Sequence, residues 1–517
     1  MQPSPVPPGV TTAAPASPGL LDRHPAIIVL GLLALCLAVT VPHALAKPFW
    51  HDEIYTILVS RLPSFGAMWT AALSGVDLSP PLSVWLTRAA HSVTGVGPIS
   101  TRLPAMCGFY LSVVVVFLLL RRRVGSTGAL AGSLFLLYTA APRYAAEARS
   151  YGVMLGLFAG VLFFWMEAAA GRRRAIYIPL LTISLAASLW NHYYGVLVFA
   201  PVLAGEAARC ARNRRVDLPV AVAIGAALAA VVPLFPLMRV ASAQRGTFWL
   251  AAAPGEQLFE LHQFLIQPLV DAPLVLAGVL LAVLLSRLPV PGRHTTAAVV
   301  QQHELAAVLV ALTIPLLGFL LGRFVTGGLA PRYILNGAVA VSIAVPMALT
   351  SRGRRKPVAD LLLLFVLGLG ATTAAVGAWY PARTAMTDPV ASRPLLTGSL
   401  RQPGPTVISG SLQFLPVWYY TPQALKPKLL YVASTQEAMR WSRSDTIDRG
   451  YQALARTVSL PVMDYETFVR THIEFRVYDN GSGWLLDALS AAGATVEIAG
   501  AEPGGRLLLV RLPTRGQ

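Results

Sequence analysis

The stretch AIIVLGLLALCLAVTVPHALAKPFWHDE, residues 26–53, decides how this chain folds. Residues 26–46 are predominantly apolar, and the run is about as long as a helix that crosses the hydrocarbon core of a bilayer. Two adjacent acids, Asp52 and Glu53, follow where the chain would leave the membrane. Carboxylates are costly in or near hydrocarbon, and those retained there usually have a function. The pair is therefore the first candidate for chemistry.

The composition is that of a protein with many membrane spans. Hydrophobic residues make up 55% of the 517 residues, charged residues only 13%, and the mean hydropathy is +0.60. The net charge of +17 does not indicate nucleic-acid binding, because the arginines cluster on alternate loops, as they do on cytoplasmic loops. The three cysteines show neither a disulfide framework nor a metal motif. The basic clusters are Arg121–Arg123, Arg172–Arg174, Arg212–Arg215 and Arg352–Lys356.

Eleven apolar runs are predicted to span the membrane as helices. The first ends in Ala44-Leu45-Ala46, which resembles a signal-peptidase site, but the run is longer than the apolar part of a usual signal peptide, so we expect a retained helix. Residues 1–22 are rich in Pro, Ala, Ser and Thr and are predicted to be a disordered cytoplasmic tail. The predicted spans are 26–46, 101–120, 126–142, 151–170, 175–190, 195–209, 218–238, 273–286, 305–322, 334–350 and 358–379.

The basic clusters, placed in the cytoplasm, put the N-terminus inside and residues 380–517 outside. We therefore predict a transmembrane domain over 23–379, with a first outer loop at 47–100, and an extracytoplasmic soluble α/β domain over 380–517. That last segment has no GxGxxG motif, so no nucleotide site is expected in it. Its expected strands are 407–410, 429–433, 475–478, 495–498 and 507–510, and its expected helices are 411–420 and 484–492.

Distinctive polar residues lie on the predicted outer loops, whereas the middles of the spans carry almost no charge. An ion-coupled transporter usually needs ionisable groups at the midplane, so this distribution argues against transport. Within the first outer loop, residues 54–62 and 65–73 are predicted to lay an apolar face on the membrane surface. The polar residues of the later outer loops are Arg143, Tyr144, Glu147, Arg149, Tyr151, Trp190–Tyr194, Arg323 and Pro331–Tyr333.

Acids and arginines on one membrane face indicate an enzyme that acts on a lipid with an anionic head. Arginine supplies planar, bidentate donors for phosphate oxygens. A carboxylate supplies a general base for a hydroxyl nucleophile, or a ligand for a hard cation. Simpler explanations stay open: Asp52 could cap the helix that follows it, Asp77 could start the turn before Pro80, and Glu147 could form a structural ion pair.

The order of these motifs resembles that of the GT-C membrane glycosyltransferases, among them the protein O-mannosyltransferases and the lipid A aminoarabinose or galacturonic-acid transferases. The resemblance covers about residues 26–350. The motifs that carry it are Asp52-Glu53 after the first span, Asp77 before Pro80-Pro81-Leu82, Glu-Ala-Arg-Ser-Tyr-Gly at 147–152, Asn191-His192-Tyr193 and Pro331-Arg332-Tyr333.

The resemblance implies a polyprenyl-phosphate-linked sugar donor, action at the outer face and inversion of the anomeric centre. It implies that Asp52 is the catalytic acid of the first loop and that Arg149 and Arg332 hold the donor phosphate. Some relatives carry His, Lys or Glu where this chain has Asp77, so the role of Asp77 is left open. The resemblance implies no function for the C-terminal domain.

We therefore predict a polytopic α-helical membrane protein of GT-C type that transfers a sugar from a polyprenyl phosphate to a hydroxyl of a lipid, glycan or protein, at the outer face of the cytoplasmic membrane. A divalent cation held by Asp52, Glu53 or Asp77 could assist. A lipid-linked glycan transporter or scaffold, and an outer-face lipid-phosphate transferase, are the alternatives. The predicted site comprises Asp52, Glu53 and Asp77 as catalytic residues, Arg143, Arg149, Arg332 and Tyr333 at the donor phosphate, and Glu147, His192 and Tyr193 at the substrate.

Overall fold

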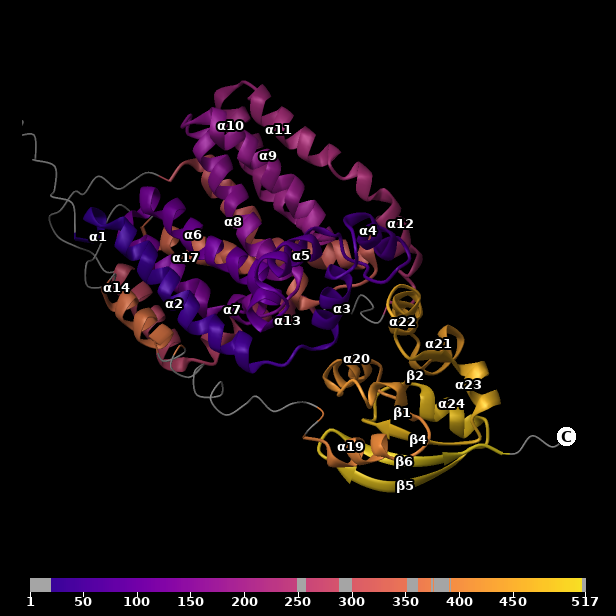
Figure 1. The fold of residues 1–517 in the computed structure, drawn as a ribbon. Coiled ribbons are helices and arrows are strands. Elements are labelled where there is room, and N and C mark those ends of the chain that lie inside the picture. The colour runs from indigo at the N-terminus through magenta and orange to yellow at the C-terminus, as the bar shows by residue number, and fades with distance from the viewer. Residues whose placement is uncertain are drawn as a thin grey trace, which may run out of the picture.

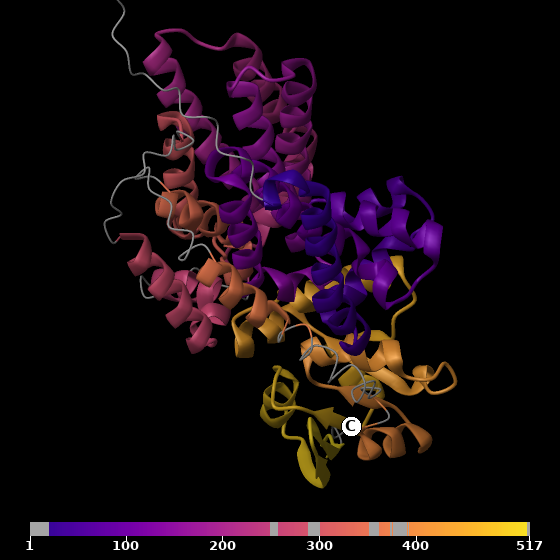
Figure 2. The same cartoon turned by 90° about the vertical axis from the view of Figure 1, so that its left-hand side faces the viewer.

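The protein consists of a helical body and a smaller sheet domain beneath it, as Figure 1 and the perpendicular view in Figure 2 show. The structure is a computed structural model and describes residues 20–248, 257–287, 300–350, 361–372, 375, 390 and 392–513. Most of the predicted tail and the predicted boundary at 379 lie outside these residues.

The helical body is built almost entirely of apolar helices. Its helices are α1 (Leu20–Arg23), α2 (Pro25–Ala46), α3 (His51–Ser60), α4 (Phe65–Leu73), α5 (Leu82–Thr94), α6 (Pro98–Phe135), η1 (Leu136–Tyr138), α7 (Ala141–Ala145), α8 (Ser150–Ala169), α9 (Arg174–Asn191), η2 (Tyr193–Val198), α10 (Phe199–Asn213), α11 (Leu218–Ala229), η3 (Val232–Leu234), α12 (Phe235–Ala243), α13 (Gln257–Val270), α14 (Pro273–Arg287), α15 (Gln302–Leu312), α16 (Ile314–Leu321), η4 (Gly322–Thr326), η5 (Pro331–Ile334) and α17 (Asn336–Thr350), with 361–372 also helical.

Helix α6 is a hairpin of two helical arms rather than one long rod. Gly125 interrupts it with a φ of 73°, a left-handed conformation that glycine adopts without strain. The Ser133 hydroxyl donates to the Val113 carbonyl at 3.1 Å, although a straight helix would hold these residues about 30 Å apart. The two arms therefore lie side by side and correspond to the separate runs predicted at 101–120 and 126–142.

The number of membrane spans stays a prediction. Helical residues occur in each of the eleven predicted runs. By length and composition alone, however, five helices among the described residues can cross a membrane, or up to seven if each bent helix pair counts as one span. The hairpin of α6 is one of those five.

The basic clusters meet at one end of the helical body. Arg122 and Arg172 both contact Glu167, and Arg174 and Arg209 both contact Asp217. The start of α2 lies at this same end, because Arg121 donates to the carbonyl of Asp22. The cluster predicted at Arg352–Lys356 falls outside the described residues.

The far end of α2 lies about 30 Å from the basic clusters, because its 22 residues rise about 1.5 Å each. That separation matches the hydrocarbon thickness of a bilayer. The loop that carries Asp52 begins at this far end, so the acids and the basic clusters lie at opposite ends of a span-length helix.

The C-terminal domain is a six-stranded sheet in the order β3-β2-β1-β4-β6-β5. Strands β3, β2, β1 and β4 are parallel, and β6 and β5 complete the sheet in antiparallel pairing. All the predicted strands and helices of this domain are present; β3, four α-helices and the short 3₁₀ helix η6 were not predicted. The elements are α19 (Pro394–Arg401), β1 (Thr406–Ile408), α20 (Ser411–Tyr420), η6 (Lys426–Lys428), β2 (Leu429–Ala433), α21 (Thr435–Ser442), α22 (Thr446–Thr457), β3 (Val462–Asp464), α23 (Tyr465–Thr471), β4 (Glu474–Asp479), α24 (Leu485–Ala491), β5 (Thr495–Glu502) and β6 (Gly505–Arg511).

Helix α3 is shared between the two parts of the protein. Its apolar residues Ile54 and Ile57 are fully buried in one hydrophobic cluster with Phe414 and Leu415 of α20. The backbone N–H of Phe49 donates to the Tyr420 hydroxyl at 2.6 Å across the same boundary. The prediction that residues 54–62 lie on the membrane surface was therefore wrong, because the soluble domain covers their apolar face.

Candidate active site

A cavity of about 240 Å³ lies between the helical body and the sheet domain, at the end of the body away from the basic clusters. Its walls come from loops that are far apart in the sequence. The principal lining residues are Trp50, His51, Asp52, Tyr55, Asp77, Ser79, Arg149, Tyr151, His192, Tyr193, Tyr194, Arg332 and Tyr333 from the body, and Leu412, Thr446, Ile447 and Gly450 from the domain.

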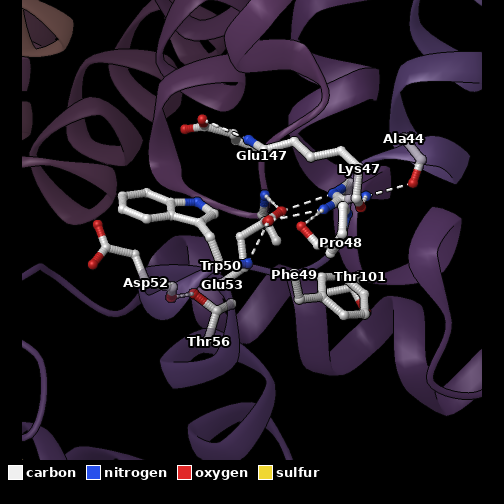
Figure 3. A network of polar contacts seen from close by, with 12 residues as sticks. Ala44, Lys47, Pro48, Phe49, Trp50, Asp52, Glu53, Thr56, Thr101 and Glu147 are labelled. Carbon is white, nitrogen blue, oxygen red and sulfur yellow. Dashed lines mark hydrogen bonds and ion pairs between the residues drawn. The ribbon is translucent and has the colours of Figure 1, made fainter. Parts of the chain in front are cut away.

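Asp52 presents its carboxylate to this cavity. It occupies the first turn of α3, where the helix dipole favours negative charge. Its side chain is 23% exposed, and Oδ2 lies 3.9 Å from Nη2 of Arg332. Figure 3 shows the carboxylate projecting away from the polar network around Glu53. Asp52 is thus accessible to a ligand and held near a cation.

Glu53 points the other way and belongs to a buried ion pair. Its Oε1 accepts from Nε of Arg102 at 2.7 Å and its Oε2 from Nη2 at 2.8 Å, and both side chains are fully buried. Oε1 also accepts from the backbone of Ala148 at 2.9 Å. Arg102 donates in turn to the carbonyls of Ala44 and Lys47. The pair joins the end of α2, the start of α6 and the loop before α8, and the structure does not place Glu53 in the cavity.

Asp77 and Arg149 form a pair within the cavity wall. Nη1 of Arg149 donates to Oδ2 of Asp77 at 2.9 Å, and the backbone N–H of Ser79 donates to Oδ1 at 3.0 Å. Burial alone would raise the pKa of Asp77, but the charge and hydrogen bonds of Arg149, together with Ser79, hold it below its ordinary value. Asp77 is therefore ionised and acts on the cavity by orienting Arg149.

The hydrogen-bonding capacity of Arg149 is not fully used within the described residues. Its Nη2 lies 3.3 Å from the Ser79 hydroxyl, whereas its Nε is buried and has no partner within the described ranges. Burial would lower the pKa of this guanidinium, but Asp77 and then Asp52 raise it well above its ordinary value. A buried donor without an acceptor costs free energy, so an acceptor atom brought to this part of the wall would lower that cost.

Arg332 faces the same space from η5. Its Nε donates to the Tyr151 hydroxyl at 2.8 Å, and its guanidinium carbon lies 5.7 Å from the ring centre of Tyr151 and 5.9 Å from that of Tyr333. Burial would lower its pKa, but the neighbouring tyrosines and Asp52 raise it above the ordinary value. Arg332 is therefore a fixed cation beside Asp52.

Two histidines line the cavity in the neutral form. His192 packs 4.8 Å from the ring of Tyr333, and burial with the nearby Arg149 and Arg332 lowers its pKa to about 3. Its Nδ1 accepts from the backbone of Tyr194 at 3.1 Å, which assigns the ring proton to Nε2. Burial lowers the pKa of His51 to about 4.

These histidines make the folded state sensitive to acid. Their ordinary pKa is 6.5, so below that pH the unfolded chain takes up protons that the folded chain does not. The free energy of unfolding should therefore fall as the pH is lowered from about 6.5 toward 4, by about 2 kcal/mol per histidine at pH 5. Thermal unfolding of His51→Gln in detergent should depend less on pH than that of the wild type. The exposed His262→Gln is the control, and equal pH dependence in all three proteins would contradict the assignment.

Besides Glu53, two predicted site residues lie outside the cavity. Glu147 pairs with Nζ of Lys47 at 2.8 Å, and the guanidinium of Arg143 lies 5.9 Å from the ring centre of Tyr144. The structure brings Asp52, Asp77, Arg149, His192, Tyr193, Arg332 and Tyr333 together. Their functional roles stay predictions.

Several cavity residues were not predicted. His51, Ser79 and Tyr151 adjoin residues of the predicted motifs, and that adjacency is a signal that could have found them. Residues Thr446–Gly450 carry no comparable signal, because only the packing of α22 against Tyr55 brings them to the cavity.

The predicted cation site does not fit the described side chains. No three His, Cys, Asp or Glu residues gather as metal ligands in the described part of the chain. Glu53 is engaged by Arg102 and Asp77 by Arg149, which leaves Asp52 as the carboxylate not engaged in a close ion pair. A hard divalent cation usually takes several carboxylate oxygens as ligands. The reaction proposed below is therefore written without a metal ion.

Comparisons with known proteins agree with this architecture. Residues 79–238 match the family of dolichyl-phosphate-mannose-protein mannosyltransferases. The crystal structure of ArnT from Cupriavidus metallidurans bound to undecaprenyl phosphate is similar with a TM-score of 0.59 and 13% identity, over 95% of this chain and 99% of that one. Its apo structure gives the same score and identity over 95% and 98% of the two chains. No curated protein gives a significant sequence match. The chain thus has the fold of the ArnT structures, with several helices long and apolar enough to cross a membrane, and over residues 79–238 it carries the sequence pattern of the dolichyl-phosphate-mannose-protein mannosyltransferase family.

Proposed function

We propose that this protein is an inverting glycosyltransferase that moves a sugar from a polyprenyl-phosphate donor to a hydroxyl acceptor at the outer face of the cytoplasmic membrane. One observation carries the proposal: a carboxylate, Asp52, and two fixed cations, Arg149 and Arg332, face one cavity at the end of the helical body away from the basic clusters. The ArnT structure of the same fold holds undecaprenyl phosphate, which supports a donor of this class.

In the proposed reaction, the carboxylate of Asp52 removes the proton from the acceptor hydroxyl as its oxygen attacks the anomeric carbon. The new glycosidic bond forms as the bond from that carbon to the phosphate oxygen breaks on the opposite side. The proton ends on Asp52, and the bonding electrons leave with the phosphate, which gains a second negative charge. Because attack and departure occur on opposite faces of the carbon, the anomeric centre is inverted.

The arginines would stabilise the departing phosphate more than the bound donor. The donor phosphate carries one negative charge and the leaving group two, so fixed cations interact more strongly as the bond breaks. Arg149 offers its unpartnered Nε, and Arg332 is held beside Asp52 by Tyr151. Neutral His192 offers an Nε2 proton to the same space without adding charge.

The direct test is a panel of polyprenyl-phosphate sugars incubated with the purified protein in detergent, with release of polyprenyl phosphate as the readout. At least one donor should be cleaved, slowly by water and faster when a hydroxyl acceptor is added. The same panel with Asp52→Asn controls for contaminating hydrolases. If no donor releases polyprenyl phosphate above the Asp52→Asn level, the proposed function is wrong.

Loss of either arginine should weaken both donor binding and turnover. One charge-assisted contact contributes about 1.5–3 kcal/mol, or roughly 10-fold to 150-fold, in Arg149→Ala or Arg332→Ala. Lysine at either position should restore only part of this, since it keeps the charge but loses the planar fork. Donor binding and single-turnover rates are the measurements.

Arg143→Ala is the matched control for this pair, because Arg143 lies on the nearby helix α7 and does not line the cavity. It should leave both rates near the wild-type values. Unchanged values for Arg149→Ala and Arg332→Ala, in protein that is still folded, would leave the phosphate without a partner and contradict the assignment.

The proposed orientation has its own test. The basic end of the body would face the cytoplasm, and the cavity and sheet domain would face outside. A phosphatase reporter that is active only outside the cytoplasm should be active when fused after Gln517 and inactive when fused after Arg174. The reverse pattern would exclude action at the outer face.

A further inference from the structure

The strand order of the C-terminal domain creates a second hollow that the proposed reaction does not use. The chain runs from β1 outward to β2 and β3 on one side, and then returns to place β4 on the other side of β1. In open parallel sheets, the carboxyl ends of the two strands at such a reversal form a crevice where ligands bind. Here Gly410 after β1 packs closely on Asn480 after β4, and a solvent-open hollow lies beside this point, lined by Gln413 of α20, by Asp479 and Asn480, and by Gly504–Arg506.

The hollow contains a buried polar atom that has no partner. Gln413, on the first turn of α20, is nine-tenths buried and lines the hollow. Its Nε2 donates to the Gly504 carbonyl at 3.1 Å, which fixes the orientation of the amide. Its Oε1 has no hydrogen-bond partner within the residues described. A buried acceptor of this kind needs a donor from a ligand, and a hydroxyl group supplies one.

The charges around the hollow favour an anion. Oδ1 of Asp479 accepts from the Ser409 hydroxyl at 2.6 Å, and Oδ2 accepts from Nε of Arg506 at 2.9 Å, so this carboxylate is already neutralised. Arg393 also lines the hollow, and within the described ranges its guanidinium has no ion pair. The amino end of α20 points into the same crevice and adds positive potential.

The hollow adjoins the candidate active site. Leu412, the residue before Gln413 on α20, lines both the reaction cavity and this hollow, and its side chain is 44% exposed. A ligand held in the hollow therefore lies one side chain away from the cavity that contains Asp52. A nucleotide does not suit the site, because the turn from β1 to α20 has a single glycine and lacks the phosphate-binding fingerprint.

We infer that this hollow is a binding site for an anionic sugar, a unit with free hydroxyls and a carboxylate or phosphate group, and that it holds part of the acceptor glycan. Arg393 binds the anionic group, and Gln413 Oε1 accepts from a sugar hydroxyl. The assignment to the acceptor rests on the proposed function. The binding site itself rests only on the sheet topology, the unpartnered amide oxygen and the charges.

Equilibrium dialysis of the full-length protein tests the site with four probes: D-glucuronate, D-glucose 6-phosphate, D-glucose and inorganic phosphate. The two anionic sugars should bind at least about 10-fold more tightly than glucose or inorganic phosphate, because each lacks one of the two recognised groups. Equal binding of inorganic phosphate and glucose 6-phosphate would reduce the hollow to a simple anion site and overturn the inference.

Variants locate the binding. Arg393→Ala should weaken both anionic sugars about 10-fold, with Arg393→Lys in between, and Gln413→Met should weaken them without changing the binding of inorganic phosphate. Arg511→Ala, at the other end of the strand that carries Arg506, is the matched control and should bind normally. Arg332→Ala should also bind normally; loss of binding there would place the probes in the reaction cavity and overturn the inference.

Donor cleavage separates this inference from the proposed function. Arg393→Ala and Gln413→Met should release polyprenyl phosphate by hydrolysis at the wild-type rate, since neither side chain lines the reaction cavity. If the protein cleaves donor but both variants bind the sugars as tightly as the wild type, the hollow is not the binding site, and the proposed function still stands. If sugar binding depends on Arg393 but the protein cleaves no donor, the binding site is supported and the proposed function is wrong.

Discussion

Asp52→Asn is expected to lower the transfer rate by about 100-fold or more while leaving the fold intact. The carboxylate is the proposed general base, and loss of such a base costs roughly this factor. Among the described residues its carboxylate has one ion-pair partner, Arg332, at 3.9 Å, so the amide should be tolerated structurally. Single-turnover rates at saturating donor, with thermal unfolding of each variant, make the measurement.

Two further carboxylates serve as controls for this result. Glu147→Gln, outside the cavity, should stay near the wild-type rate. Asp77→Asn should weaken donor binding more than the chemical step, because Asp77 acts by orienting Arg149. A near-normal rate for Asp52→Asn together with an inactive Asp77→Asn would show that Asp77 is the base.

Glu53→Gln is expected to have the largest effect on stability. It leaves Arg102 charged, fully buried and without its carboxylate, and breaking a buried pair in this way costs about 3–5 kcal/mol. Thermal unfolding in detergent should show a large loss, whereas Glu147→Gln, whose partner Lys47 is partly exposed, should show little.

The double variant Glu53→Leu with Arg102→Met tests whether the uncompensated charge of Arg102 causes the loss of stability in Glu53→Gln. Replacing both charges by apolar groups should be less destabilising than leaving one of them uncompensated, so the double variant should unfold at a higher temperature than Glu53→Gln. A Glu53→Gln protein that is fully stable yet inactive would instead support the catalytic role predicted from the sequence.

The apolar runs and the order of the polar motifs were enough to predict the fold class, because length, hydropathy and charge asymmetry constrain membrane helices strongly. They could not separate Asp52 from Glu53. Neighbouring residues on a helix point about 100° apart, and only the packing of α3 decides which of them meets Arg102 and which meets the cavity.

The contribution of the sheet domain to the cavity was beyond the reach of the sequence. Thr446 and Gly450 belong to an amphipathic helix, α22, whose residues resemble those of any surface helix. They reach the cavity because the domain packs on α3, where an added Cβ at Gly450 would lie 2.9 Å from the Tyr55 hydroxyl. Contacts between segments about 400 residues apart in the chain leave no local pattern.

The common core of α3 and the sheet domain also determines which pieces of this protein can be exchanged. A chimera that replaces residues 392–513 with the domain of a relative would set foreign side chains against Phe49, Ile54 and Ile57. Because well-packed cores tolerate changes of volume poorly, such a chimera should misassemble at the helix that carries Asp52. The unit of recombination is therefore discontinuous, and a successful graft would carry residues 49–62 together with the domain.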